Sequence, residues 1–212
     1  DVYFWGAQVQ TDSTVTDYIP TGATISGAPR FDHDPVTGES LGLLIEEART
    51  NDLTNSEVFS SGIAGTASEN VAISPSGEQN ADKWIPWTTY AYHYPSITSS
   101  GYTNQDVVYS VFVKEAGYRY ILINTPDGST QGNSGPIIDL QNGLVVGNYG
   151  NVYETVVSNA GNGWYRVSIP FERNSGNFKV DHNPFPTTTA APYTGDGTSG
   201  VLLWGSQLEQ GL

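Results

Sequence analysis

The chain contains no cysteine and no methionine, and basic residues are scarce. Its 212 residues include 8 Lys and Arg against 22 Asp and Glu, which gives a formal net charge of −14. Without cysteine there is neither a disulfide framework nor a thiolate metal site. A surface of this charge repels phosphate backbones, and no cluster of Lys and Arg reverses the sign locally. The composition therefore argues against nucleic-acid binding.

Long apolar runs are also missing. No segment approaches the roughly 20 apolar residues of a membrane-spanning helix, and none shows a sustained helical period. Instead, short apolar runs alternate with Thr, Ser and Asn, and 24 Gly and 12 Pro separate them. This pattern is typical of a turn-rich, all-β protein, and we expect no membrane insertion.

Two segments show the strand alternation most clearly, DVVYSVFVKE at 106–115 and NGWYRVSIPFE at 162–172. Asn142-Gly143 predicts a tight hairpin. About ten short strands at this spacing fit a jelly-roll β-sandwich. Residues 175–199, rich in Pro and Thr, are expected to form a long surface loop. The expected strands are 2–10, 41–46, 69–74, 81–86, 90–98, 106–114, 118–124, 135–140, 143–147, 152–158, 163–173 and 200–210.

The first 50 residues differ from the rest in composition. Residues 11–30 are rich in Thr, Ser, Gly and Pro, and Asp34–Glu39 has the turn residues of a hairpin. We therefore predict an N-terminal arm over 1–50, made of an extra strand and a hairpin. The jelly-roll domain is expected over 51–212.

The two ends of the chain carry the same short pattern. Aligning Trp5 with Trp204 gives Val-x-x-x-Trp-Gly-(Ala/Ser)-Gln at both. An exposed strand with Tyr3, Phe4 and Trp5 would aggregate, so we expect it to be paired. Two explanations stay open. Residues 1–10 are the remnant of a tandem array, or they are an assembly strand that fills a sheet edge of another subunit or of their own domain.

Several segments together resemble a known family. The linker FDHDPVTGESLGLLIEEARTN is similar to one found in tail fibre and tail-associated proteins of tailed phages and prophages. In that family it precedes a jelly-roll module similar to carbohydrate-binding modules. Other matching segments are LTNSEVF, ADKW, YSVFVKE, GNGWYRVSI and LLWGSQLEQG. Tyr18-Ile19-Pro20-Thr21, the tail that follows the final strand in the family, here follows the first copy instead.

The resemblance implies a non-enzymatic phage structural protein at the virion surface, and hence extracellular. Its role would be assembly and attachment, as a tail fibre, spike or capsid decoration. The implied partners are other virion subunits, in a homo-oligomer, and a host-surface glycan. A purely structural assembly protein is one rival. Another is an accessory carbohydrate-binding module of a secreted polysaccharide-degrading enzyme. Fold similarity alone does not establish sugar binding, since jelly rolls have many functions.

The richest aromatic cluster is KWIPWTTYAYHYPS. Alternation would place three tyrosines on one strand face, where rings stack on the apolar faces of sugars. A protein–protein contact explains the cluster equally well, and some of its rings are expected to be core. The candidate contact residues are Trp84, Trp87, Tyr90, Tyr92 and Tyr94.

Other residues give weaker signals. Glu46 and Glu47 are adjacent, so on a strand they point to opposite faces and cannot form a glycosidase pair by themselves. His33, His93 and His182 lack zinc-ligand spacing. Jelly-roll carbohydrate modules often hold one structural calcium ion. The candidate calcium donors in this sequence are Glu57, Glu69, Asp82 and Asp139. The acidic residues Asp32, Asp34 and Glu39 do not have the spacing of an EF-hand loop.

Two tryptophans and two cations are assigned structural roles. Trp164 and Trp204 alternate with small or apolar neighbours and are expected in the core. Arg166 and Lys114 lie on expected strands and are predicted to pair with acidic residues at the sheet margin.

Overall fold

The computed structural model describes residues 31–33, 40–43, 50–53, 55–100, 105–127, 132–150, 154–173 and 177–210. The chain divides into two compact units, Asp1–Ala48 and Arg49–Leu212. In the first unit, β1 (Phe31–His33) pairs antiparallel with β2 (Ser40–Leu43), which confirms the predicted hairpin.

The expected N-terminal strand with Tyr3, Phe4 and Trp5 lies outside the described residues, as do Glu46 and Glu47. The assembly role of that strand therefore stays a prediction.

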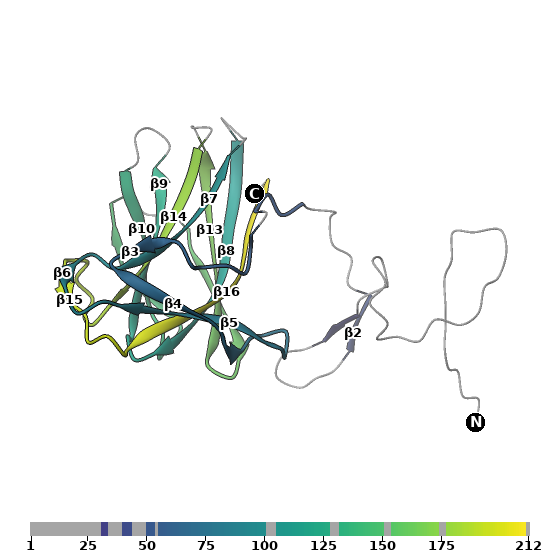
Figure 1. Ribbon diagram of the computed structural model, residues 1–212. Coiled ribbons are helices and arrows are strands. Elements are labelled where there is room, and N and C mark those ends of the chain that lie inside the picture. Colours follow the sequence, from purple (N-terminus) through teal and green to yellow (C-terminus); the bar gives the residue numbers. More distant parts are fainter. Residues whose placement is uncertain are drawn as a thin grey trace, which may run out of the picture. The chain divides into compact units, whose positions relative to one another are not determined.

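The second unit consists of two six-stranded antiparallel sheets that pack as a sandwich (Figure 1). The β14 sheet contains, in spatial order, β11 (Leu144–Tyr149), β10 (Gly132–Asp139), β9 (Tyr120–Asp127), β14 (Asn177–Phe185), β7 (Tyr94–Ser100) and β3 (Gly62–Ile63). The β16 sheet contains β12 (Val156–Gly161), β13 (Trp164–Arg173), β8 (Gln105–Ala116), β16 (Gly200–Gln210), β5 (Gln79–Pro86) and β4 (Gly65–Ile73). A small ribbon pairs β6 (Tyr90–Ala91) with β15 (Tyr193–Thr194).

The connections between strands make this sandwich a jelly roll. The chain moves from β7 in the β14 sheet to β8 in the β16 sheet, and then back to β9 and β10. It crosses again to β13, returns to β14, and ends with β16 in the centre of the opposite sheet. The all-β, jelly-roll prediction is confirmed. Among the described residues there is no helix, and so none long and apolar enough to span a membrane.

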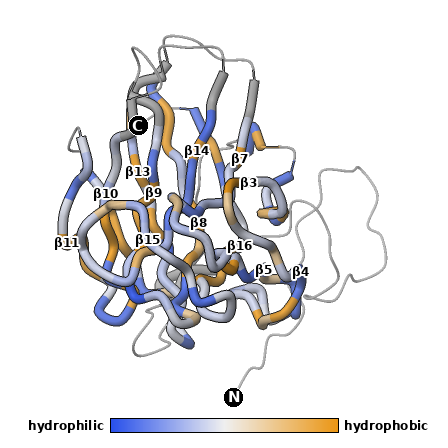
Figure 2. Tube along the Cα trace, turned by 60° about the vertical axis from the view of Figure 1, so that its left-hand side comes forward, coloured by the Kyte–Doolittle hydropathy of each residue, from blue (hydrophilic) through white to orange (hydrophobic). Residues whose placement is uncertain are grey.

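The core fills the space between the two sheets. Inward-facing residues of β8 and β13, such as Tyr109, Val111 and Ile169, meet Ile123 and Val180 from the β14 sheet, and all are fully buried. Figure 2 shows hydrophobic residues recurring along strands such as β10, with mostly hydrophilic residues in the turns. Where a strand is regular, alternation leaves every second residue on an outer face; register shifts interrupt it in β4 and β16.

The predicted loop over 175–199 is wrong in its first half, because Asn177–Phe185 is β14, between β9 and β7. Its composition hid it: a proline is rare inside a sheet, where it removes a ladder hydrogen bond. Pro184 is tolerated because β14 pairs with β7 only as far as Asp181 and beyond that with β9 alone.

The single strand expected over 90–98 is interrupted. Tyr90–Ala91 pairs with Tyr193–Thr194, whereas β7 begins at Tyr94. Between them His93 is fully buried, and its ring nitrogens lie 2.5 Å from the Ala64 oxygen and 2.9 Å from the Tyr193 oxygen. Because the His93 side chain points inward between the two short strands, the alternation that the sequence suggested over 90–98 is interrupted.

The outer face of the β16 sheet carries both tryptophans assigned to the core. Trp164 is 2% exposed, and Trp204 packs partly buried against the same small cluster, which lies outside the main core. Gly205, at a φ of 59°, forms a bulge that shifts the register between Trp204 and Gln207. The bulge keeps both of these residues on the outer face. In β16 the Trp-Gly-x-Gln pattern therefore encodes a bulge at the glycine that places the tryptophan and the glutamine on the same face.

The predicted acidic partners of the two strand cations are not found among the described residues. Arg166 donates to the Ser110 hydroxyl at 3.1 Å and to Gln207 Oε1 at 2.8 Å. Lys114 donates to the Asn162 carbonyl at 2.6 Å. Neutral oxygens on the same face supply the acceptors that acidic residues were expected to provide.

Candidate functional site

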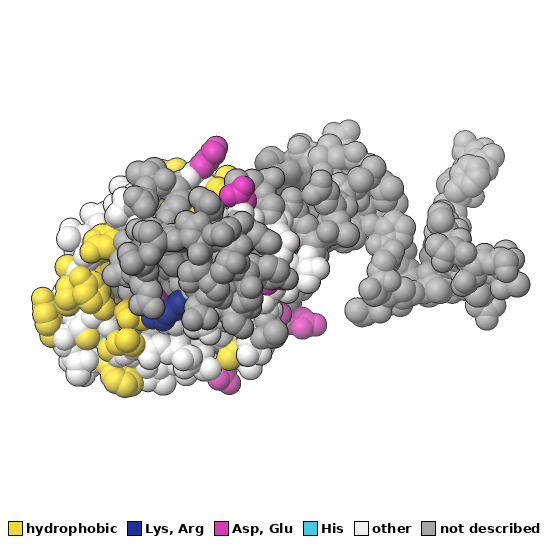
Figure 3. Space-filling model, turned by 90° about the horizontal axis from the view of Figure 1, so that it is seen from above, with side chains coloured by type: hydrophobic (Ala, Val, Ile, Leu, Met, Phe, Trp, Pro, Cys, Tyr) yellow, Lys and Arg dark blue, Asp and Glu magenta, His cyan; other side chains and the backbone are white. Residues whose placement is uncertain are grey.

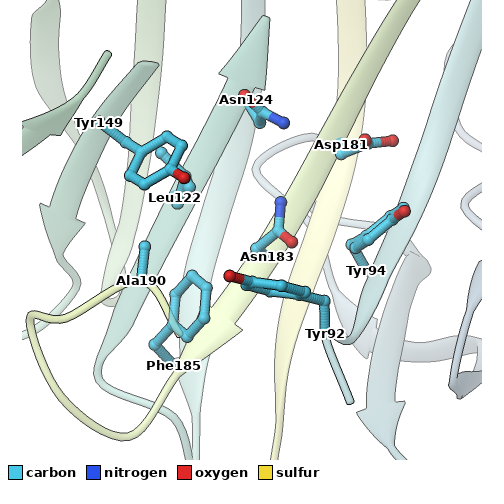
Figure 4. Close-up of a pocket in the computed structure, with 9 residues that line it drawn as sticks. All are labelled: Tyr92, Tyr94, Leu122, Asn124, Tyr149, Asp181, Asn183, Phe185 and Ala190. Atoms are coloured by element: carbon cyan, nitrogen blue, oxygen red, sulfur yellow. The ribbon is translucent and has the colours of Figure 1, made fainter. Parts of the chain in front are cut away.

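A hollow lies on the outer face of the β14 sheet, across β7, β14, β9 and β11 (Figure 4). We call it the β14 hollow. It measures about 120 Å³, below the roughly 300–1,000 Å³ of sites that enclose a small ligand, so it can take only part of a larger one. Its lining consists of Tyr92, Tyr94, Leu122, Asn124, Tyr149, Asp181, Asn183, Phe185 and Ala190.

Strand alternation on β14 places three lining residues side by side. Asp181, Asn183 and Phe185 point outward into the β14 hollow, whereas Val180 and His182 point into the core and are fully buried. As whole residues all three are more than nine-tenths buried, and the Asp181 side chain is 12% exposed. Their neighbours hold them in place, so the hollow has a preformed floor.

The neighbouring strand β9 continues this floor. Asn124 pairs in register with Asp181, and Leu122 pairs with Asn183. Tyr149, at the end of β11, closes the far side and is 42% exposed. The site thus draws side chains from segments far apart in sequence, which only the jelly-roll strand order brings together.

One end of the hollow is charged but internally neutralised. The Ser96 hydroxyl donates to Asp181 Oδ1 at 2.6 Å, and Lys179 Nζ lies 3.0 Å from the same oxygen. The ammonium group also lies 5.0 Å from the centre of the Tyr94 ring. The carboxylate therefore has a cationic partner of its own.

The centre of the hollow is an amide. Asn183 is 4% exposed, and its carboxamide lies in the middle of the lining residues (Figure 4). No hydrogen bond to this side chain is found among the described residues. A carboxamide offers two donor hydrogens and an acceptor oxygen, and those of Asn183 face the hollow and not other described protein groups. A ligand in the hollow would supply the missing partners.

The other end of the hollow is apolar. Leu122 and Phe185 belong to a small outer cluster, against which Ala190 and Tyr193 pack. The Tyr193 hydroxyl donates to the Pro184 carbonyl at 2.7 Å, and burial raises the pKa of this phenol. That contact ties the segment after β14 down over the cluster.

The core side of β14 is neutral. His182 Nε2 accepts a hydrogen bond from the Tyr109 hydroxyl at 2.7 Å, while Nδ1 donates to the Pro95 carbonyl at 3.4 Å. Burial lowers the pKa of His182 to about 4. The strand that carries the amide of the hollow is thus anchored through an uncharged imidazole.

The structure brings two of the five predicted contact residues together. Tyr92 and Tyr94 line the β14 hollow. Trp84 is 1% exposed and lies in the main core, so it is not available to a surface ligand. Trp87 and Tyr90 are exposed, at 50% and 74%, but lie outside the lining. The aromatic cluster therefore splits between core, surface and site.

Sequence reasoning missed most of the lining. In VDHNPF three polar residues stand in a row, so no alternation marked the strand, and its proline and polar composition favoured a loop. The missed residues are Leu122, Asn124, Tyr149, Asp181, Asn183, Phe185 and Ala190.

The candidate calcium donors do not form a site. Asp139 is bound by the Arg119 guanidinium, which holds the pKa of that carboxyl well below its usual range. Both oxygens of Asp82 accept backbone N–H groups. No group of three or more acidic or histidine side chains that could hold a metal occurs in the described part of the chain. With Glu57 and Glu69, these carboxylates do not fit the calcium ion that the resemblance implies.

Comparisons with known proteins add no assignment: no protein-family model and no curated protein matches the chain.

Proposed function

We propose that this chain is a non-enzymatic structural protein of a tailed-phage virion, whose jelly-roll domain attaches the particle to a glycan through the β14 hollow. One observation carries the attachment role. A buried carboxamide, Asn183, faces outward between aromatic side chains on a preformed sheet surface. Aromatic faces and amides are the groups that bind the C–H faces and hydroxyls of sugars.

The charged groups of the hollow support binding over hydrolysis. A glycosidase places two carboxyl groups across the scissile bond. Among its lining residues the β14 hollow has a single carboxylate, Asp181, and Lys179 neutralises it. This arrangement offers no acid–base pair.

The virion assignment rests on the sequence resemblance, and with it the extracellular location at the virion surface. The acidic composition is compatible with it. The accessory-module alternative predicts a similar binding face but a monomer. The two alternatives are separated by the oligomeric state of the chain and by whether removal of the N-terminal arm changes that state.

Glycan binding is tested with the full chain on an array of bacterial surface polysaccharides and their fragments. We expect defined hits that Tyr92→Ala removes. Trp87→Ala is the matched control, since it deletes an exposed aromatic residue outside the hollow, and it should leave the hits unchanged. Equal losses in both variants, or no hits at all, would contradict the proposal.

A second role, assembly, is favoured by one lateral side of the sandwich. The edge strands β11 and β12 contain no charged residue, although the chain carries a net charge of −14. Leu144, Val145 and Val156 are exposed there, at 58%, 39% and 56%. The opposite edge strand β4 has Glu69 and register shifts, which protect an edge from pairing. We propose that copies of the chain pair through the uncharged edge.

Assembly is tested by light scattering of the full chain. Val145→Lys is expected to lower the oligomer mass, because an edge lysine opposes strand pairing. Val71→Lys, at a similarly exposed position on β4, is the control. A monomeric parent chain, or equal effects of the two variants, would remove the support for assembly through this edge.

A further inference from the structure

We infer that the β14 hollow selects sugars that carry an N-acetylated amino group, with the acetamido group as the part that enters. This inference rests on the proposed glycan binding and narrows it to a ligand class. It follows from three features of the lining: a central amide, an apolar end, and the absence of a free cation among the described lining residues.

The first feature is the central amide. The N–H and the C=O of an acetamido group point in opposite directions because its amide is trans, so the Asn183 carboxamide can donate to the acetamido carbonyl but cannot bond both groups at once. Asn183 has no hydrogen-bond partner among the described residues and lies at the centre of the hollow (Figure 4). A sugar hydroxyl could accept the same hydrogen bond, but only the acetamido carbonyl has a methyl group on the same carbon, which can then enter the apolar end.

The second feature is the apolar end. Leu122, Phe185 and Ala190 form a surface next to the amide, and Phe185 is 1% exposed. A methyl group that enters beside Asn183 would be removed from water there. The volume of about 120 Å³ suits such a substituent better than a whole sugar ring, which would stack on the tyrosines at the rim.

The third feature is charge. Lys179 lies beside the hollow, and it is engaged by the lining residue Asp181 and by the Tyr94 ring. Sialic and uronic acids would therefore meet a carboxylate without gaining a free cation. A free amino sugar would compete with Lys179 for Asp181. The neutral acetamido group avoids both penalties. In the view of Figure 3, hydrophobic side chains gather on the left-hand side of the domain, and a basic side chain is visible beside them.

Three disaccharides that differ only at C2 test the inference: the β1,4-linked dimers of N-acetylglucosamine, glucosamine and glucose. Their affinities for the full chain are measured by calorimetry, with the N-acetylgalactosamine and galactose pair as a second stereochemical series. We expect the acetylated member of a series to bind about tenfold more tightly than its hydroxyl analogue, the effect of one hydrogen bond and one buried methyl group. Saturation-transfer NMR should show the strongest contact at the acetyl methyl protons.

Two variants locate the effect. Asn183→Ala should remove the preference for the acetylated member while leaving thermal unfolding close to that of the parent chain. Asn183→Asp keeps the shape but loses the donor, so it should also lose the preference. A preference retained in both variants overturns the inference.

The remaining outcomes separate this inference from the proposed function. Equal binding of acetylated and hydroxyl sugars, abolished by Tyr92→Ala, overturns the acetamido inference and leaves glycan binding standing. Tighter binding of the free amine also overturns the inference alone. Absence of binding by every sugar, on the array and in solution, overturns both.

Discussion

The two outer faces of the sandwich carry similar residue types but differ in how far their polar groups and aromatic rings are open to a ligand. On the β16 sheet, Arg166 lies 5.7 Å from the centre of the Phe112 ring, and Lys114 lies 6.0 Å from that of Trp164. The same cations donate to neutral oxygens nearby. Arg166 Nε and Trp204 Nε1 have no hydrogen-bond partner, but both atoms are buried, so this closed face offers little to a ligand.

The β14 sheet is the open face. Its aromatics, Tyr92 and Tyr149, are 42% exposed, and the Asn183 carboxamide has no described partner. The comparison teaches that an aromatic-rich sheet face is not by itself a binding site. What marks the site is a polar side chain without a described partner that lines a hollow open to a ligand.

The largest expected effect is a loss of stability when a buried tryptophan is removed from the closed face. Trp164→Ala removes a side chain that is 2% exposed and donates to the Ile73 carbonyl at 3.1 Å. We expect a loss of about 3–5 kcal/mol in the free energy of unfolding, measured by urea denaturation followed by circular dichroism. Tyr149→Ala on the open face should cost less, about 1 kcal/mol, because Tyr149 is 42% exposed. Equal losses would show that the two faces are not energetically distinct.

The next largest effect is the pH dependence of stability that comes from His182, on the core side of β14. The pKa of His182 is about 4 in the folded protein, against 6.5 in an unfolded chain, so the unfolded state takes up the proton first. Stability is therefore highest above pH 6.5 and falls as the pH drops toward 4, by about 3 kcal/mol from this group. Unfolding by urea at several pH values measures the slope.

His182→Gln should flatten that slope, and it serves as the control for other titrating groups. The low pKa of Asp139 adds a further loss only below about pH 3.8, outside this window. An unchanged slope in the variant would show that His182 is not the group responsible.

The alternation of β8 and β13 was predictable because their inward residues are uniformly apolar, as at Val111 and Ile169. The Asn142-Gly143 hairpin was also predictable, since Gly143 adopts a φ of 64° between β10 and β11. In both cases the local pattern and the global fold require the same residues.

β14 could not be predicted in the same way. The polar residues that make it a site, Asp181 and Asn183, are those that make its sequence look like a loop. The position of Gln207 was hidden for another reason, because the bulge at Gly205 shifts the alternation by one residue. Trp5-Gly6-Ala7-Gln8 repeats that pattern outside the described residues, and a bulged strand there stays a prediction.

A smaller effect sharpens the comparison on the closed face. Arg166→Met keeps an apolar stem over Phe112 but removes the hydrogen bonds to Ser110 and Gln207. We expect a loss of about 1–2 kcal/mol in unfolding free energy, because the site is only partly buried. Glycan binding by the open face should not change. A loss of binding would mean that the two faces are coupled.

The smallest expected effect is on the open face itself. Lys179→Met removes an ion pair whose lysine side chain is 49% exposed, so stability should change by less than about 1 kcal/mol. The consequence for ligands is larger, because Asp181 then lacks its cation while still accepting from Ser96. We expect the variant to gain affinity for the glucosamine disaccharide relative to its acetylated counterpart, measured by calorimetry at a pH where the amine is charged. Lys83→Met, which removes a cation bonded to the Thr198 carbonyl, is the control and should leave the ratio unchanged. An unaltered ratio in Lys179→Met would show that the lysine does not set the charge preference of the hollow.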